Sequence, residues 1–310
     1  MSHLRRRKKV SKVLILGLAE SGKSTIIKVV NEGKIPSKDD DYNATIDYER
    51  KQKVVAGTEL TIFDLGGQTA FLDRFTGELS EFIFTGVKSF VFVVDSIEIK
   101  NISRAKYYLD LAVKKLAQFS PEATLFIFQH KADLIPKKMK QEVRKTIEDY
   151  LGSGIPKKIK YYETSVFSDS IFKAMGEVYA DASGARKTLR PLLETFIQHN
   201  MADMAQIFTK EGAPLTKVEK VSKFEHINLY EVREFFDAVV KRLADSETHT
   251  ATSTLLESDQ RVFVIRFMEN GLALFFGFSK SRLRERNEPV ASLYNRVLAF
   301  SSQLQSITES

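Results

Sequence analysis

The chain contains no cysteine. This absence excludes a disulfide framework, thiol chemistry and a metal site built on thiolates. Long apolar runs are missing as well, since no stretch approaches the roughly 20 apolar residues that a membrane-spanning helix needs. The basic start of the sequence lacks the apolar core of a signal peptide. We therefore expect a cytoplasmic protein.

The sequence also lacks recognisable sites for lipid attachment. Ser2 stands where myristoylation needs glycine, and residues 307–310 contain no cysteine for prenylation. Residues 5–9 (RRRKK) form the densest charge run in a chain whose net charge is +7. They predict recruitment to an anionic membrane surface or an acidic partner, at about 1 kcal/mol per basic residue near a membrane. The alternative is a solvated lead-in to the first strand, and no aromatic stacking motif accompanies the run, so we expect no nucleic-acid partner.

Residues 17–24 read GLAESGKS and follow the apolar run 13–16. A loop of this pattern between a strand and a helix is typical of polyphosphate binding, because its glycines let consecutive backbone N–H groups face the phosphates. Lys23 would reach the β and γ oxygens, and Ser24 would ligate Mg²⁺. The alternative is an ordinary glycine-rich turn. We expect the nucleotide to contact Ala19, Glu20, Ser21, Gly22, Lys23, Ser24 and Thr25.

A second motif, residues 63–68 (FDLGGQ), ends another apolar run. Asp64 at a strand end would hold Mg²⁺ through water, and Gly67 would bring its N–H to a γ-phosphate. Gln68 is placed to orient an attacking water. Taken alone, Asp-Leu-Gly-Gly is an ordinary turn, but the order of these parts along the chain is typical of a molecular switch.

Thr45, in a polar stretch upstream of this motif, would complete the Mg²⁺ shell and sense the γ-phosphate. With this threonine, GLAESGKS and DLGGQ resemble the Ras-like small GTPases, and more the Arf and Gα branch than Ras itself. The resemblance implies GTP as the nucleotide, GDP as the product and Mg²⁺ as the cofactor. It also implies catalytic roles for Lys23, Thr45 and Gln68.

Guanine choice in that superfamily rests on an N-K-x-D motif, whose aspartate pairs with the guanine N1 and N2 hydrogens. Here the apolar run 124–129 is followed by His130, Lys131 and Asp133, with histidine in place of asparagine. H-K-x-D resembles the Rag/Gtr GTPases, and GLAESGKS is similar to the phosphate loop of their RagC/RagD-type members. The resemblance implies that these three residues belong to the base site. Without Lys131 and Asp133 beside it, His130 would be interpreted as a hydrogen-bonded bystander.

Residues 163–174 (ETSVFSDSIFKA) resemble the base-contacting loop of the same family. The resemblance implies that Ser165 and Val166 line the base, with the backbone N–H of Val166 facing the guanine O6. An imidazole at position 130 offers one donor and one acceptor, whereas a carboxamide offers an acceptor oxygen and two donors. The strictness of guanine selection therefore stays open.

The 310 residues leave room for two domains, and 43% hydrophobic with 28% charged residues is typical of a globular chain. Residues 181–191 are small, polar and basic, which predicts a short hinge. After them the pattern predicts a helix, two strands, a helix over 228–244, two or three strands and a last helix. Asn270-Gly271, between two apolar runs, is a strong hairpin signal. This order resembles the roadblock/longin-type module of Rag/Gtr proteins.

We therefore expect an α/β fold: a P-loop, doubly wound, mostly parallel sheet of the Ras-like type over 1–184, then a roadblock-like α/β dimerisation domain over 185–310. The resemblance implies a homodimer or a heterodimer through the second domain, docking on roadblock-type scaffold proteins, and regulation by GTPase-activating and exchange factors. No arginine precedes Thr45 in residues 42–44, so we expect slow hydrolysis. Two alternatives stay open: a scaffold that holds GTP without hydrolysing it, and a P-loop ATPase or small-molecule kinase.

Overall fold

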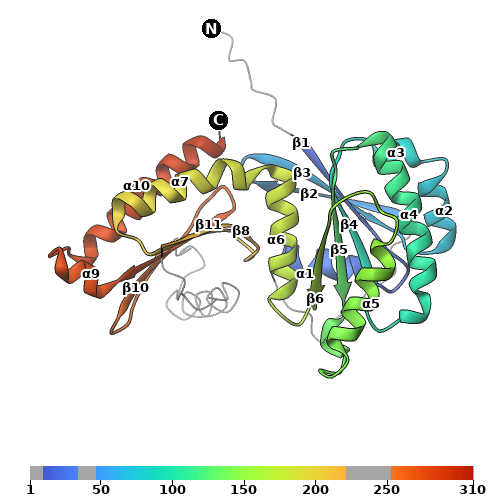
Figure 1. The fold of residues 1–310 in the computed structure, drawn as a ribbon. Helices are drawn as coiled ribbons and strands as arrows, with labels where there is room; N and C mark the ends of the chain where they lie inside the picture. Colours follow the sequence, from blue (N-terminus) through green and yellow to red (C-terminus); the bar gives the residue numbers. More distant parts are fainter. Residues whose placement is uncertain (1–9, 34–46, 221–252, 310) are drawn as a thin grey trace, which may run out of the picture. The chain divides into compact units, whose positions relative to one another are not determined.

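The computed structural model describes residues 10–33, 47–220 and 253–309 (Figure 1). These residues form two compact units, one built mainly from residues 10–182 and the other mainly from residues 183–309. Three predictions lie outside the described residues: the magnesium ligand Thr45, the basic run 5–9 and the helix over 228–244. No helix in the described ranges has both the length and the apolar character needed to cross a membrane.

The first unit is built on a six-stranded sheet with the strand order β2-β3-β1-β4-β5-β6. Five of the strands are parallel to their neighbours in the sheet. The interior positions of the central strands β1, β4 and β5 are mostly apolar and buried, as expected for a sheet covered on both faces, whereas those of the edge strand β6 are partly exposed. The strands are β1 (Val10–Leu16), β2 (Tyr48–Val55), β3 (Thr58–Leu65), β4 (Val87–Asp95), β5 (Thr124–His130) and β6 (Ile159–Thr164).

Helices cover both faces of this sheet (Figure 1). On one face Leu14 and Phe92 pack with apolar residues of α2, α3, α4 and α5 in a single core cluster. Alternate residues point to the opposite face, where Ser89 of β4 donates to the carboxylate of Asp181 in α6 at 2.7 Å, and where α1 also lies. The helices are α1 (Lys23–Glu32), α2 (Thr69–Thr76), α3 (Ser80–Phe84), α4 (Ile102–Phe119), α5 (Lys140–Gly152) and α6 (Ser170–Ser183). Two short 3₁₀ turns are η1 (Ile99–Asn101) and η2 (Ala132–Leu134).

This architecture confirms the predicted doubly wound, mostly parallel sheet. The direction in which successive strands are added to the sheet reverses at β1, because β3 pairs with one edge of β1 and β4 pairs with the other. In such sheets ligands bind outside the carboxyl ends of the strands at the point of reversal. The loop after β1 therefore lies where the fold favours a binding site.

The second unit contains a five-stranded antiparallel sheet with the order β8-β7-β11-β10-β9. The rings of Phe196, Phe276 and Phe300, from α7, β11 and α10, lie 4.4 to 5.6 Å apart and join the two helices to the sheet. This sheet and its helices are compatible with the predicted roadblock-like domain. The elements are α7 (Ala185–Asn200), β7 (Met204–Thr209), β8 (Pro214–Glu219), β9 (Ser253–Glu257), β10 (Arg261–Phe267), β11 (Leu272–Ser279), α9 (Lys280–Glu285) and α10 (Val290–Glu309).

The Asn270-Gly271 hairpin is confirmed. Gly271 has a φ of 79° between the paired strands β10 and β11, a conformation that glycine adopts without strain.

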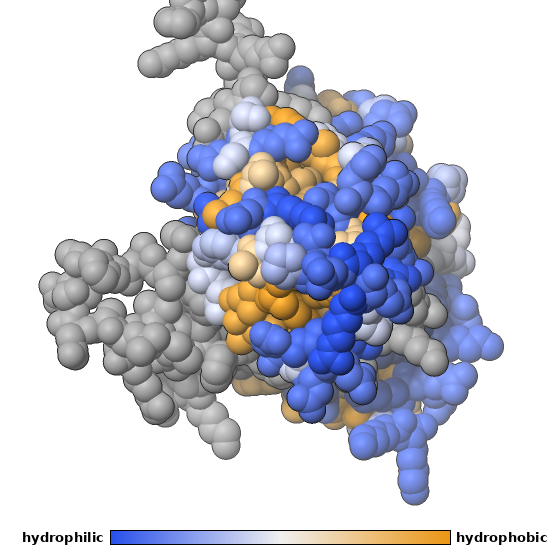
Figure 2. All heavy atoms as spheres, turned by 90° about the vertical axis from the view of Figure 1, so that its left-hand side faces the viewer, coloured by the Kyte–Doolittle hydropathy of each residue, from blue (hydrophilic) through white to orange (hydrophobic). Residues whose placement is uncertain are grey.

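Figure 2 shows the side of the molecule that carries α9 in Figure 1, where patches of apolar side chains lie between hydrophilic ones.

The predicted hinge over 181–191 contains the point where the chain passes from one compact unit to the other, but it is helical except for one residue. The helix α6 runs to Ser183 and α7 begins at Ala185, so Gly184, with a φ of 73°, is the one residue between them. Polar composition was misleading because Arg186, Lys187 and Arg190 occupy the exposed face of α7. Ala185, Leu189 and Leu193 recur every four residues and are buried, so the helical period starts before Pro191, which lies inside α7.

Candidate nucleotide-binding site

The loop of residues 17–24 connects β1 directly to α1. Glu20 and Gly22 have positive φ values of 62° and 93°, and such left-handed residues turn successive amides toward one side of a loop. Gly17 is required by space, because a Cβ there would lie 2.2 Å from the carbonyl oxygen of Val93. The first N–H groups of α1 have no carbonyl partner within the helix. The loop is therefore shaped to hold a polyphosphate.

Lys23 reaches back over this loop. Its ammonium donates to the carbonyl oxygens of Gly17 at 2.9 Å and Leu18 at 2.8 Å, and the residue is only 5% exposed. Burial lowers the pKa of Lys23 from 10.5 to about 8, while the carboxylate of buried Asp64 acts in the opposite direction. The charge of this lysine therefore depends on pH close to neutrality.

This pKa gives a testable pH dependence. A polyphosphate favours the protonated ammonium, so binding above pH 8 takes up a proton, and we expect nucleotide affinity to be flat up to about pH 7.5 and then to fall by up to about tenfold per pH unit. Affinity measured by calorimetry between pH 6.5 and 9.5 checks this. Lys12 is a matched control, because burial also lowers its pKa to about 8 but it lies outside the loop and bonds Phe82. Lys12→Met should keep the slope, and a flat profile in the wild type would contradict the prediction.

The second motif lies against the phosphate loop. The N–H of Ala19 donates to the carbonyl oxygen of Gly67 at 2.8 Å, and a Cβ on Gly67 would lie 2.4 Å from the nitrogen of Ala19. Asp64 is 1% exposed near the end of β3, and Gln68 is exposed at the N-cap of α2. The segment that carries Asp64 and Gln68 thus contacts the loop that carries Lys23.

A further contact joins this motif to Asp47, two residues after the predicted magnesium ligand Thr45. The N–H of Gly66 donates to the carbonyl oxygen of Asp47 at 2.7 Å, and Arg74 of α2 forms a 3.1 Å ion pair with the Asp47 carboxylate. Neither residue was singled out from the sequence. Thr45 itself, as a proposed magnesium ligand, lies outside the described residues.

The predicted base-site residues lie at the end of β5 and directly after β5 and β6, and β5 is the neighbour of β4 in the sheet. Lys131 has a φ of 60° and its ammonium donates to the carboxylate of Asp95 at 2.7 Å, at the end of β4. Asp133, in η2, is exposed. His130 is 2% exposed and its Nδ1 lies 3.0 Å from the hydroxyl of Thr164.

Ser165 and Val166 come directly after β6 and are both buried. The N–H of Ser165 donates to the hydroxyl of Ser170 at 2.9 Å, and the hydroxyl of Ser165 accepts from the N–H of Phe167 at 3.1 Å. These bonds fix the loop by its own side chains. The loop therefore has a defined shape.

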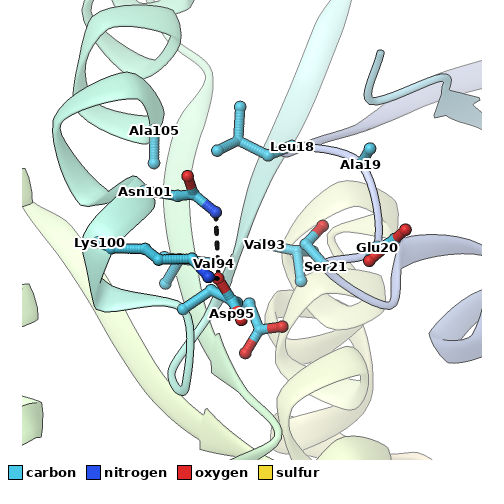
Figure 3. A pocket seen from close by; sticks show the side chains of 11 residues that line it. Leu18, Ala19, Glu20, Ser21, Val93, Val94, Asp95, Lys100, Asn101 and Ala105 are labelled. Carbon is cyan, nitrogen blue, oxygen red and sulfur yellow. Dashed lines mark hydrogen bonds and ion pairs between the residues drawn. The ribbon is translucent and has the colours of Figure 1, made fainter.

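A pocket of about 270 Å³ opens on the flank of the phosphate loop (Figure 3). Leu18 and Ala105 form part of its apolar wall. At its polar side the carboxylate of Glu98 accepts from Asn101 at 3.3 Å and pairs with Lys100 at 3.0 Å. The residues after β4 thus contribute to the surroundings of the loop, which the motifs alone did not indicate.

The residues present fit a nucleotide with Mg²⁺. Hydroxyl and carboxylate oxygens, as offered by Ser24 and Asp64, are the ligands that Mg²⁺ prefers in proteins, usually together with waters and substrate phosphates. In the described part of the chain there is no group of three or more His, Cys, Asp or Glu residues that would hold a metal without such a substrate.

The conserved region of Gtr1/RagA G proteins matches residues 12–239 of this sequence, more than half of its 310 residues. The chain belongs to the Gtr1/RagA family of G proteins. This membership confirms the resemblance to Rag/Gtr GTPases that the H-K-x-D and GLAESGKS motifs carry.

Individual Rag and Gtr proteins are similar to the chain over much of its length. Ras-related GTP-binding protein A of Dictyostelium discoideum is 25% identical over 267 residues, which cover 84% of this chain and 87% of that protein. Ras-related GTP-binding protein C of Homo sapiens is 28% identical over 211 residues, covering 64% and 50%. GTP-binding protein GTR1 of Saccharomyces cerevisiae is 26% identical over 173 residues, covering 54% and 55%. The chain thus spans most of the first relative and about half of the other two.

Two polar side chains at strand ends contact the predicted base-site residues, and neither was given a role from the sequence. Thr164 ends β6 and bonds His130, and Asp95 ends β4 and pairs with Lys131. A signal was available, because polar residues at the carboxyl ends of buried parallel strands are the ones that such a sheet brings together.

Proposed function

We propose that this G protein binds GTP with Mg²⁺ and hydrolyses it slowly to GDP and phosphate, changing its affinity for partners as it does so. The observation that carries the proposal is Lys23, a buried ammonium held over a glycine-bounded loop at the point where the strand order reverses. Membership of the Gtr1/RagA family supports guanine as the base.

The proposed roles combine the motifs of the sequence with the positions of the described side chains. Lys23 and the N–H groups of residues 19–25 would bind the phosphates, and Ser24 and Thr45 would hold the metal ion, with Asp64 contacting it through water. Bound Mg²⁺ would supply positive charge that neutralises the phosphate oxygens. Gln68, which is exposed, would orient the attacking water. Water adds to the γ-phosphorus as the bond to the β–γ bridging oxygen breaks, giving GDP and inorganic phosphate.

Base recognition is assigned to the residues after β5 and β6. Asp133, which is exposed in η2, would accept the guanine N1 and N2 hydrogens, and the N–H of Val166 would face O6. Lys131 is held by its ion pair with Asp95. This geometry supports a guanine site whose recognition rests mainly on Asp133.

A competition experiment tests the proposed activity. The purified chain is incubated with Mg²⁺ and equimolar GTP and ATP, and bound and hydrolysed nucleotides are quantified by chromatography over hours. Retained guanine nucleotide with slow formation of GDP supports the switch. Retained ATP would favour an ATPase or kinase, and GTP held without formation of GDP would favour a scaffold.

The division into a GTPase domain over 1–184 and a dimerisation domain over 185–310 is part of this proposal. It is supported by the compact unit that begins near Ser183 and by its antiparallel sheet, whose outermost strands are β8 and β9. Relatives named Gtr1, Gtr2 and RagC suggest pairing with a second Rag-type GTPase. Sedimentation of the full chain distinguishes a homodimer, at twice 35.3 kDa, from a monomer that needs another partner.

The proposal extends to regulators and location. Roadblock-type scaffolds would bind the second domain, and activating and exchange factors would act on the first. The proposed location is cytoplasmic, with recruitment to a membrane surface through residues 5–9.

A further inference from the structure

A second pocket, of about 410 Å³, is formed by residues of the second unit. It lies where the turn before β10 meets the junction of β11 and α9, because Arg261 pairs with Ser279 in the sheet and the N–H of Lys280 donates to the carbonyl oxygen of Gln260 at 2.9 Å. The described residues that line it are all polar or charged. A pocket of this size can hold a small molecule, and its polar walls favour a charged, hydrated ligand.

The charge of the lining favours an anion. Four basic side chains line the pocket: Arg261, Lys280, Arg282 and Arg284. The acidic side chains are those of Asp203 and Asp259, and Lys280 forms a 2.5 Å ion pair with Glu257 of β9. Basic groups still outnumber acidic ones when Glu257 is counted, so the pocket attracts negative charge.

One of these cations is anchored by a buried carboxylate. Asp203 is 3% exposed, and it accepts from the N–H of Ser279 at 2.7 Å and from the guanidinium of Arg282 at 2.5 Å. An arginine has five N–H donors, and this bond uses one of them. Asp203 therefore fixes the guanidinium of Arg282 and leaves donors for a ligand.

Arg284 adds a second guanidinium to the same pocket. It is exposed, and among the described residues its guanidinium has no hydrogen bond or ion pair. The hydroxyls of Ser279 and Ser281 also line the pocket, 2.8 Å from each other. Guanidinium forks and hydroxyls suit the oxygens of a phosphate, and the volume leaves room beside it for an organic group that carries hydroxyls.

We propose that this pocket binds a phosphorylated polyol, with Arg282 and Arg284 contacting the phosphates and Asp203 acting as the positioning residue for Arg282. The ligand is either a free polyol phosphate or the same group on a membrane lipid. This inference does not rest on the proposed nucleotide site, because the described lining residues all belong to the second unit. It gives the second unit a ligand of its own.

The test uses inositol trisphosphate as the probe, with the full chain in excess GDP and Mg²⁺ so that the phosphate loop is filled. Isothermal titration calorimetry should show one site in the wild type. Arg284→Ala should weaken binding by about tenfold, since it removes a charged donor. Arg286→Ala is the matched control and should bind as the wild type does, because Arg286 is exposed at the end of the same helix but does not line the pocket. Absence of saturable binding, or equal losses in the two variants, would overturn the proposal.

Two carboxylate variants separate positioning from charge. Asp259→Asn removes an exposed negative charge from the pocket and should tighten trisphosphate binding by about threefold. Asp203→Asn also removes a negative charge, but it loosens Arg282 and should weaken binding by about threefold. Tighter binding by Asp203→Asn would refute the positioning role. Arg282→Lys keeps the charge without the fork, and it should show the same loss if Asp203→Asn folds poorly.

Vesicles distinguish the two sources of the ligand. Phosphatidylcholine vesicles that contain phosphatidylinositol bisphosphate are compared with phosphatidylcholine vesicles that carry the same charge as phosphatidylserine. Capture that depends on the bisphosphate lipid and falls in Arg284→Ala assigns the pocket to a membrane lipid. Equal capture by both kinds of vesicle, with trisphosphate binding intact, assigns it to a free polyol phosphate. A chain that binds the trisphosphate but no nucleotide would contradict the proposed function alone.

Discussion

Replacing Lys23 with alanine should weaken the binding of both GTP and GDP by at least about 100-fold. Hydrogen bonds from a charged donor are worth about 1.5 to 3 kcal/mol each, and the ammonium of Lys23 is placed to make at least two to a polyphosphate. The side chain is almost fully buried in the loop, so solvent screening reduces this effect little. Isothermal titration calorimetry of the nucleotide-free chain with each nucleotide measures the loss.

Lys28 provides the matched control, since it lies on the same helix five residues further on. Lys28→Ala should bind nucleotide as the wild type does. Lys23→Ala should fold normally, because its truncation removes an ammonium whose burial is unfavourable, as its lowered pKa shows. A loss of less than tenfold would mean that the loop holds its ligand mainly through backbone N–H groups.

Replacing Gln68 with leucine should leave nucleotide affinity unchanged and slow hydrolysis by at least about tenfold. The proposed unassisted rate is already on the order of 10⁻⁴ to 10⁻³ per second. Gln68 makes no side-chain cap to α2, and its backbone carbonyl accepts from Phe71 and Leu72, so the exchange should preserve the helix start. Single-turnover hydrolysis of GTP, followed by chromatography, gives the rate.

Thr69→Ala is the control for this variant, since Thr69 is also exposed and is the first residue of α2. Its rate should match that of the wild type. Unchanged hydrolysis by Gln68→Leu would remove Gln68 from the proposed mechanism and direct attention to another group for orienting the water.

Local sequence was sufficient to locate the phosphate loop. A buried strand, a glycine-bounded loop and a helix follow one another within residues 10–32, and each depends on its own neighbours in the chain. The same reasoning located the second motif at the end of β3 and the hairpin at Asn270-Gly271. The roles of these site residues in binding and catalysis stay predictions.

Contacts between distant strands could not be predicted in the same way. The contact of His130 with Gly22 depends on the order in which β1, β4, β5 and β6 join the sheet, which no local pattern encodes. The expectation of a hinge without helix at residues 181–191 failed for a local reason. Composition was given more weight than the four-residue period of Ala185, Leu189 and Leu193, which indicates a helix.

The N–H of Ala19 donates to the carbonyl oxygen of Gly67, so this carbonyl occupies an N–H group of the phosphate loop that a bound phosphate would otherwise use. A bound diphosphate would leave the position that faces Gly67 empty, so the phosphate loop and residues 63–68 could stay in contact. A triphosphate would have to displace the carbonyl and turn the N–H of Gly67 inward. A neutral hydrogen bond contributes about 0.5 to 1.5 kcal/mol, so this self-contact should shift the balance toward GDP by about two- to tenfold. Without a partner, this hydrogen bond would therefore favour the GDP-bound form. A partner that separates Gly67 from Ala19 would favour GTP without contacting the nucleotide.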